Sequence, residues 1–373
     1  MIDSNLIVRV PSIVCTPGRA VLYDEYLYSD KPVRLSNLLR KQISLTGSRA
    51  HISKRSTSKI KKAVEYITTF SPRKTVYDQA TNKSITFQLT FITLTLSSNQ
   101  IHTDNDVKKM LLHQFITEVT NKYSVKYYLW RIEKQLNGNA HIHFICNKFI
   151  PYYELRVMWN RIQNKLGYVD RYRDNMRDYY KDGFRLSDNK YDKRDYKTQF
   201  EAYKRGLLTD YQQPNSTDIH KIFNITNLAA YVSKYMSKNN KDHYVKVKSD
   251  NNIKHYRVDD NSRYYMAGVL RYLRKQCSRG RLWGCNAQLS SLTGASSEVD
   301  SSILEEIERL KKDKEVWFYR GDYFACFYFD MQTLISNKCL NIFNLILNDI
   351  IDKVGYKDEY LIDSSTNRKE IIW

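Results

Sequence analysis

The stretch of sequence that decides the fold reads Asn139-Ala-His141-Ile-His143-Phe-Ile145. Successive side chains of a β-strand point to opposite faces, so His141 and His143 would share one face and the apolar residues beside them the other. The two Cα atoms would be about 6.6 Å apart, which lets both imidazole rings reach one cation. The pattern therefore predicts a half-buried strand that carries two candidate metal ligands.

A second strand-like run, Tyr127–Lys134, lies upstream and is followed by Asn137-Gly138. Asn-Gly between two such runs is a strong hairpin signal, and folding this hairpin brings Glu133 towards the two histidines. One carboxylate and two imidazoles form a mixed oxygen and nitrogen ligand set that suits Mg²⁺ or Mn²⁺. The alternative interpretation is that both histidines are ordinary surface or core residues.

A third stretch, Tyr231-Val-Ser-Lys234-Tyr235-Met-Ser-Lys238, has helical spacing. At 100° per residue, its two tyrosines and two lysines fall within one arc of about 100°. An adjacent apolar stripe consists of Ile225, Leu228, Ala229, Val232 and Met236. The pattern predicts a helix with one packed side and, beside it, two phenols and two ammonium groups. Alternatively, this is a surface helix with half-buried tyrosines and solvated lysines.

Together these motifs resemble those of replication initiators of the HUH endonuclease superfamily, which is named for its His-hydrophobic-His motif. The likeness is strongest to the two-tyrosine initiators of small single-stranded DNA phages and related rolling-circle plasmids. Phe91–Leu96 resembles the first family motif, Glu133 with His141-Ile-His143 the metal motif, and Tyr231–Lys238 the nucleophile motif. Arg279–Cys285 is similar to the end of such nuclease domains.

The resemblance covers about residues 85–290 and implies an α/β (α+β) fold with a central antiparallel sheet and flanking helices. It implies a metal-dependent DNA endonuclease with strand-transfer activity, in which Tyr231 or Tyr235 forms a 5′-phosphotyrosine and leaves a free 3′-OH. Lys234 and Lys238 would favour the phenolate or hold the phosphate. The polar, tyrosine-rich interval 168–218 departs from the family pattern.

The expected partners are single-stranded origin DNA, a host DNA polymerase that extends the 3′-OH, and a host helicase. A helicase partner is expected because the sequence contains no Gly-x₄-Gly-Lys-Ser/Thr loop for nucleotide binding. Two alternatives remain open. One is an HUH transposase or relaxase, which uses a related site for a different product. The other is a single-stranded-DNA or origin-binding protein without catalysis.

Composition agrees with a nucleic-acid partner. The 373 residues carry a formal net charge of +20, which favours binding to a polyanion with an affinity that falls as salt rises. Six cysteines without a Cys-x-x-Cys pair indicate reduced chemistry and no zinc or disulfide framework. We find no signal sequence and no membrane-spanning stretch, so we expect the chain to act in the cytoplasm of a bacterial host.

The chain divides into three predicted regions: a basic N-terminal region at 1–85, the nuclease domain at 86–290 and a C-terminal helical region of unknown role at 291–373. A Ser/Gly-rich linker is expected at 290–297, before a helix capped by Ser302. The first region contains a basic helix near 56–68 that either grips DNA or is a solvated helix face. Its candidate DNA-binding residues are Arg49, Lys54, Arg55, Lys59, Lys61 and Lys62.

Overall fold

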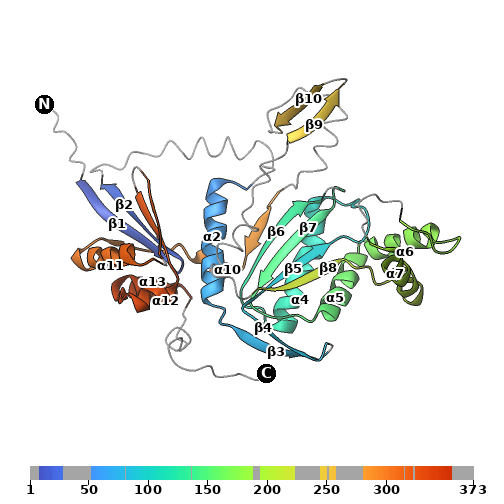
Figure 1. The fold of residues 1–373 in the computed structure, drawn as a ribbon, viewed down its shortest axis with the longest axis horizontal. Coiled ribbons are helices and arrows are strands. Elements are labelled where there is room, and N and C mark those ends of the chain that lie inside the picture. Colours follow the sequence, from blue (N-terminus) through green and yellow to red (C-terminus); the bar gives the residue numbers. More distant parts are fainter. Residues whose placement is uncertain are drawn as a thin grey trace.

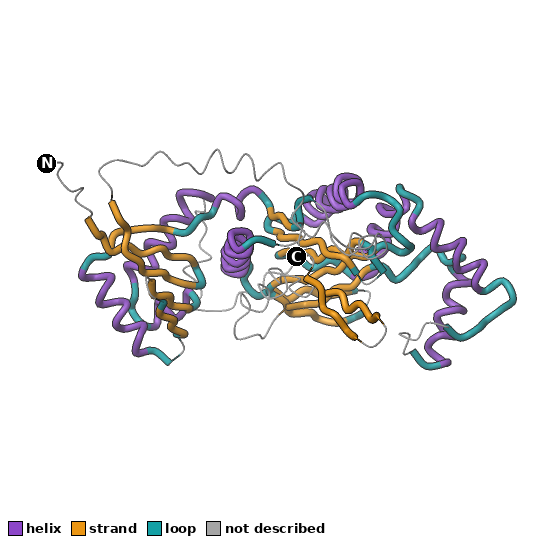
Figure 2. The backbone as a smooth tube through the Cα atoms, turned by 90° about the horizontal axis from the view of Figure 1, so that it is seen from above, coloured by secondary structure: helices purple, strands orange, loops and turns teal. Residues whose placement is uncertain are grey.

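The computed structural model describes residues 8–27, 52–79, 81–135, 137–187, 194–222, 244–249, 252–257, 280–314, 316–321 and 324–354. These residues form a mixed α/β structure with antiparallel sheets and helices, as the sequence predicted. Two five-stranded sheets stand apart, and helix α2 (Lys54–Thr69) lies between them (Figure 1). The view from above in Figure 2 shows the same arrangement, with α2 seen almost end-on.

The first sheet, called here the histidine sheet, has the strand order β11-β6-β7-β5-β8. Its strands are β5 (Leu89–Thr95), β6 (Tyr128–Lys134), β7 (Ala140–Cys146), β8 (Thr217–Ile222) and β11 (Trp283–Cys285). All neighbouring pairs are antiparallel, and β6 and β7 form the predicted hairpin. The hairpin places β7 in the middle of the sheet, so both histidines lie on its central strand.

One face of the histidine sheet is covered by helices. They are α3 (Asp104–Asp106), the π-helical segment η1 (Val107–Leu112), α4 (His113–Tyr123) and α5 (Tyr152–Asn164). Phe115 of α4 packs edge-on against Phe144 of β7, with ring centroids 5.2 Å apart, and against Trp159 of α5. Because Phe144 and Ile142 point into this core, His141 and His143 must point to the opposite face.

The tyrosine-rich interval forms two helices, α6 (Tyr168–Tyr179) and α7 (Tyr196–Leu208), which project from the far side of the histidine sheet (Figure 1). A cluster of aromatic rings, including Tyr180, Phe184 and Tyr203, joins them. Two separate hairpins complete this half: β3 (Lys74–Asp78) with β4 (Lys83–Phe87), and β9 (Tyr244–Ser249) with β10 (Asn252–Arg257).

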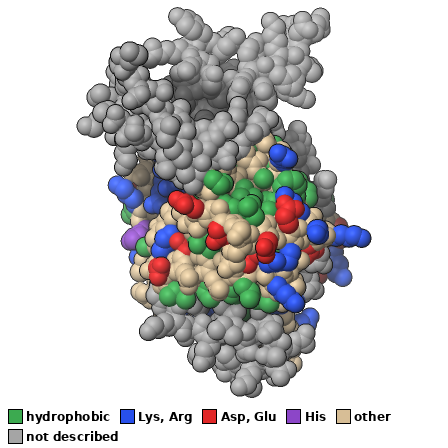
Figure 3. Space-filling view, turned by 90° about the vertical axis from the view of Figure 1, so that its left-hand side faces the viewer, with side chains coloured by type: hydrophobic (Ala, Val, Ile, Leu, Met, Phe, Trp, Pro, Cys, Tyr) green, Lys and Arg blue, Asp and Glu red, His purple; other side chains and the backbone are tan. Residues whose placement is uncertain are grey.

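The second sheet, called here the terminal sheet, joins both ends of the chain in the order β12-β1-β2-β14-β13. Its strands are β1 (Val8–Thr16), β2 (Arg19–Leu27), β12 (Ala295–Glu298), β13 (Trp317–Arg320) and β14 (Phe324–Tyr328). Helices α11 (Ser301–Lys312), α12 (Met331–Ser336) and α13 (Leu340–Val354) complete this half, and short α10 (Ala287–Ser291) lies beside α2. Figure 3 shows this end of the molecule, where acidic, basic and hydrophobic side chains are interspersed.

Helix α2 connects the two sheets because it is buried on more than one side. Ile60, Val64 and Ile67 are fully buried in a core that also contains residues of both sheets. Towards the terminal sheet, Glu65 accepts a hydrogen bond of 2.6 Å from the Thr16 hydroxyl and lies 3.5 Å from the Arg19 guanidinium. These buried contacts fix the position of α2 against the terminal sheet.

Two expectations about the C-terminal region were wrong in detail. The expected linker at 290–297 contains most of β12, which pairs with β1. Helix α11 is capped by Asp300, whose side chain accepts a hydrogen bond from the Ile303 amide, and Ser302 lies inside the helix. Besides the expected helices, the two ends of the chain thus contribute strands that need each other as partners. None of the helices in the described ranges has the length and apolar character needed to cross a membrane.

Candidate metal centre

The strand register brings the three predicted ligands together on the uncovered face of the histidine sheet. Glu133 of β6 lies directly opposite His141 of β7, and His143 follows two residues later on the same face. Residues directly opposite each other in an antiparallel pair have neighbouring side chains. The carboxylate and both imidazoles therefore converge without any contribution from a loop.

Distances among the three side chains fit a single cation. His143 Nε2 lies 3.1 Å from Glu133 Oε1, and the His141 and His143 rings are perpendicular with centroids 4.6 Å apart. One ligand atom from each residue lies within 4.8 Å of the other two. All three side chains are half-buried, so the cluster is shielded but still accessible from solvent. One carboxylate and two imidazoles leave several positions of an octahedral ion for water or phosphate oxygens.

Neighbouring side chains orient the candidate ligands. The buried Arg131 places its Nη2 atom 3.2 Å from Glu133 Oε2, which leaves Oε1 for the cluster. The side-chain amide of Gln135 lies 3.1 Å from His141 Nδ1, and Thr93 Oγ1 lies 3.5 Å from His143 Nδ1. Contacts of this kind fix ring orientation and commonly support metal ligands. In both histidines they leave Nε2 free to face the cluster.

The protonation states also suit metal binding. Burial, together with the nearby His143, lowers the pKa of His141 to about 4, although Glu133 acts in the opposite direction. Burial raises the pKa of Glu133, but the hydrogen bond with His143 and the charge of Arg131 outweigh it and hold this pKa below its usual value. At neutral pH His141 is therefore neutral and Glu133 ionised, which are the forms that bind a cation.

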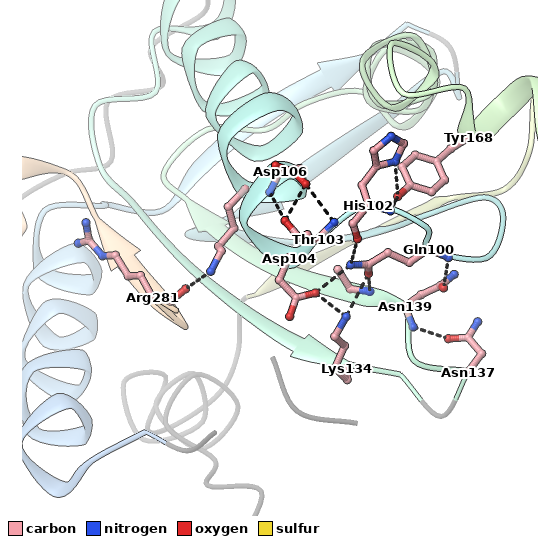
Figure 4. Close-up of polar contacts among 12 residues, drawn as sticks. Gln100, His102, Thr103, Asp104, Asp106, Lys134, Asn137, Asn139, Tyr168 and Arg281 are labelled. Carbon is pink, nitrogen blue, oxygen red and sulfur yellow. Dashed lines mark hydrogen bonds and ion pairs between the residues drawn. The ribbon is translucent and has the colours of Figure 1, made fainter. Parts of the chain in front are cut away.

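A polar network holds the turn next to the cluster (Figure 4). Lys134, which follows Glu133, is nearly buried and lies 2.5 Å from Asp104 Oδ1 and 3.2 Å from Gln100 Oε1. The same Gln100 oxygen accepts a 2.7 Å hydrogen bond from the Ala140 amide, and the Gln100 backbone amide donates to the Asn139 side chain. Because Lys134 and Ala140 flank the turn, the network ties the metal hairpin to the loop that follows β5.

A further histidine, His220, lies on the same face but outside the cluster. It stands on the edge strand β8 opposite Phe91, and its Nε2 is 2.7 Å from Asp218 Oδ2. Both side chains of this pair are exposed. Phe91 lies between the pair and the cluster, with its ring 5.2 Å from that of His143. The structure thus gives His220 a carboxylate partner of its own.

The other predicted site residues are placed less completely. Tyr231, Lys234, Tyr235, Lys238 and Arg49 lie outside the described residues. Of the basic helix residues, Arg55, Lys59 and Lys61 are exposed on α2, and only the backbone is described for Lys54. Lys62 is half-buried, and its Nζ donates a 2.5 Å hydrogen bond to the Thr293 carbonyl. Lys62 is therefore partly committed to a structural contact.

The sequence reasoning missed Arg131, Gln135 and Thr93 as supporting residues. A signal for two of them was present, because Arg131 and Gln135 are two residues before and after Glu133 and so share its face on a strand. Thr93 could be found only from the pairing of β5 with β7, which puts it opposite His143.

Comparison with known proteins yields one match. Residues 89–240 match a family model whose description is replication-associated protein of the ORF2 type. The matched range begins at β5, includes the Glu133, His141 and His143 cluster, and extends through the segment with the paired tyrosines. Neither a search of curated proteins nor a search of solved structures found a match. The family match supports a replication initiator and thus a role in DNA replication.

Proposed function

We propose that this protein starts rolling-circle DNA replication by nicking and rejoining single-stranded origin DNA through a 5′-phosphotyrosine intermediate. One observation carries the proposal: Glu133, His141 and His143 converge on one face of a sheet inside the range that matches a replication-associated family. A structural role alone does not explain two half-buried imidazoles aimed at one carboxylate and supported from behind.

In this proposal the three residues hold one divalent cation, Mg²⁺ or Mn²⁺. When bound, such an ion polarises the scissile phosphate and neutralises charge that develops on it. Arg131 holds one oxygen of Glu133, and Gln135 and Thr93 hold the imidazole rings, so the ligands need little rearrangement. The open solvent side of the cluster gives a phosphate room to approach.

The nucleophile is Tyr231 or Tyr235. Its phenolic oxygen attacks the phosphorus, a new P–O bond to tyrosine forms, and the P–O3′ bond breaks. The phenol loses its proton, and the departing 3′ oxygen gains one and becomes a free 3′-OH. The phosphodiester energy is kept in the covalent link, so a later 3′-OH can reverse the step and seal the strand. Lys234 and Lys238 favour the phenolate or hold the phosphate.

Two equivalent tyrosines allow a full replication cycle. The 3′-OH primes a host polymerase while a host helicase separates the strands in the host cytoplasm. After one round, the second tyrosine cuts the regenerated origin while the first link is still covalent, and rejoining releases a circle. The segment with both tyrosines begins just after β8, a strand of the sheet that carries the cluster.

The same chemistry would serve a transposase or a relaxase, which differ in product. The family match favours replication because its printed description is replication-associated. A binding protein without catalysis would have no use for the converged ligands. Release of closed single-stranded circles separates replication from transfer into a new target.

The decisive test incubates the protein with single-stranded oligonucleotides that cover candidate origins, in Mg²⁺ or Mn²⁺, and follows covalent protein–DNA adducts on a denaturing gel. We expect a shifted protein band that disappears in excess chelator. His141→Ala should form no adduct, whereas His113→Ala, which removes an exposed histidine on the covered side of the sheet, should react like the unmodified protein. An adduct formed equally well by His141→Ala would overturn the metal assignment.

A further inference from the structure

The terminal sheet has an exposed aromatic face. On the edge strand β13, Trp317 and Tyr319 point to the same side and are 63% and 49% exposed. Tyr328 lies opposite Trp317, and Phe324, 43% exposed, lies next to Tyr319. This side is not the helix-covered one, because Phe318 points the other way and packs against the fully buried Phe327.

The four rings form a continuous row, called here the aromatic row: Tyr328, Trp317, Tyr319 and Phe324. Successive ring centroids along it are 5.2, 6.4 and 5.8 Å apart. Exposed rings of this size cost solvation free energy, and a soluble surface seldom collects several of them without a partner. Rings that stand on a sheet and leave their faces open match the way in which sheet domains stack unpaired bases.

Cations border the aromatic row. Arg19 of β2 lies directly opposite Tyr328 of β14 in the strand register. Burial raises the pKa of the Cys326 thiol, which points to the same side as the row, and the charges of Arg19, Glu65 and Lys61 act on this thiol. Helix α2 therefore lies against this face and presents the exposed Lys61 beside it. Glu65, the acidic group there, is buried against Thr16 and Arg19.

The cations of α2 also reach the histidine sheet. Burial raises the pKa of the Cys285 thiol on β11 to about 11, and the charges of Arg281 and Lys59 act against this effect. Lys59 and Lys61 are two residues apart on α2 and are both exposed. Positive charge thus extends along α2 from the sheet with the metal cluster to the sheet with the aromatic row.

We propose that the aromatic row, together with Arg19 and Lys61, is a second binding surface for single-stranded DNA, separate from the metal centre. The rings stack on bases and the cations contact phosphates, a combination that binds single strands with little sequence preference. The choice of DNA as ligand rests on the proposed function and on the net charge of +20. The surface would hold the displaced strand while the nuclease site acts on the origin.

The test measures affinity for an oligo(dT) strand by fluorescence anisotropy, with the full chain in excess chelator, so that no nicking is needed. Trp317→Ala/Tyr319→Ala should weaken binding about tenfold or more, whereas Trp317→Phe/Tyr319→Phe should retain it. Tyr153→Ala, which removes a ring that is 69% exposed on α5, is the matched control and should bind normally. Unchanged thermal unfolding of the variants would exclude misfolding as the cause of weaker binding.

A second readout is photocrosslinking to an oligonucleotide that contains 5-iododeoxyuridine, followed by peptide mapping. Crosslinks within 317–328 support the proposal. Unaltered affinity of the double alanine variant, or crosslinks confined to other segments, would overturn it. Loss of self-association with unaltered DNA affinity would also overturn it, by showing that the face binds protein. A variant set that binds as expected while the unmodified chain fails to nick would contradict only the proposed nuclease function.

Discussion

The two five-stranded antiparallel sheets differ in what their uncovered faces carry. The histidine sheet gathers ionisable side chains that are half-buried and held by neighbours such as Arg131 and Gln135. The terminal sheet carries aromatic rings that are largely exposed, with cations at the border. Supported and partly shielded groups suit chemistry, whereas open ring faces suit binding. The comparison indicates that similar sheets in one chain have taken on different tasks.

The largest expected effect comes from removing both nucleophiles. Tyr231→Phe/Tyr235→Phe should form no covalent adduct, because no phenol remains to attack, yet it should bind oligo(dT) like the unmodified chain. Each single variant should still cleave a simple oligonucleotide but fail to release circles. The measurement is adduct and circle formation on denaturing gels, with Tyr153→Phe as control. Normal circle release by one single variant would show that its missing tyrosine is structural.

The next largest effect concerns the metal ligands. His143→Ala should lower the nicking rate by about three orders of magnitude or more, since ion-assisted charge stabilisation contributes several kcal/mol. Chelation of the unmodified protein should do the same, and added Mn²⁺ should restore only the unmodified protein. Binding of oligo(dT) should change little, because the terminal sheet is intact. Strongly weakened binding with normal nicking would reverse the roles that we assign to the two sheets.

A smaller effect is expected behind the ligands. Gln135→Ala removes the amide that lies 3.1 Å from His141 Nδ1. Loss of such a support typically costs about 10- to 100-fold in metal affinity or activity. A titration of nicking rate against Mn²⁺ should therefore shift to higher metal concentration. Gln114→Ala, on α4 across the sheet, serves as the control and should leave the titration in place. An unshifted Gln135→Ala curve would mean that the imidazole is oriented by other contacts.

The smallest effect tests the border of the aromatic row. Lys61→Ala removes one exposed cation, so the slope of log affinity against log salt concentration should decrease by about 0.7 for a single strand. Nicking of a saturating oligonucleotide should be unaffected. Lys312→Ala, which removes an exposed cation of α11, should leave the slope unchanged. Equal slopes for Lys61→Ala and the unmodified chain would place the DNA away from this part of α2.

The sequence by itself predicted the histidine sheet in its essentials. Alternation along 139–145 and the Asn137-Gly138 turn are local signals, and a two-strand hairpin brings Glu133, His141 and His143 together with few other contacts. The apolar periodicity of α2 and α5 is local in the same sense, and both helices formed close to their predicted ranges. The paired tyrosines and their lysines remain a prediction, since they lie outside the described residues.

Only the tertiary structure decided the terminal sheet and the supporting contacts of the cluster. Strand β14 pairs with β2 across nearly the whole length of the chain, and no short-range pattern specifies a partner at that separation. The segment 295–298 is polar enough to resemble a linker, and becomes a strand because β1 offers it an unpaired edge. In the same way, Thr93 meets His143 only when β5 pairs with β7. Local periodicity determines elements, whereas pairing between distant strands depends on which edges and faces remain uncovered once those elements pack.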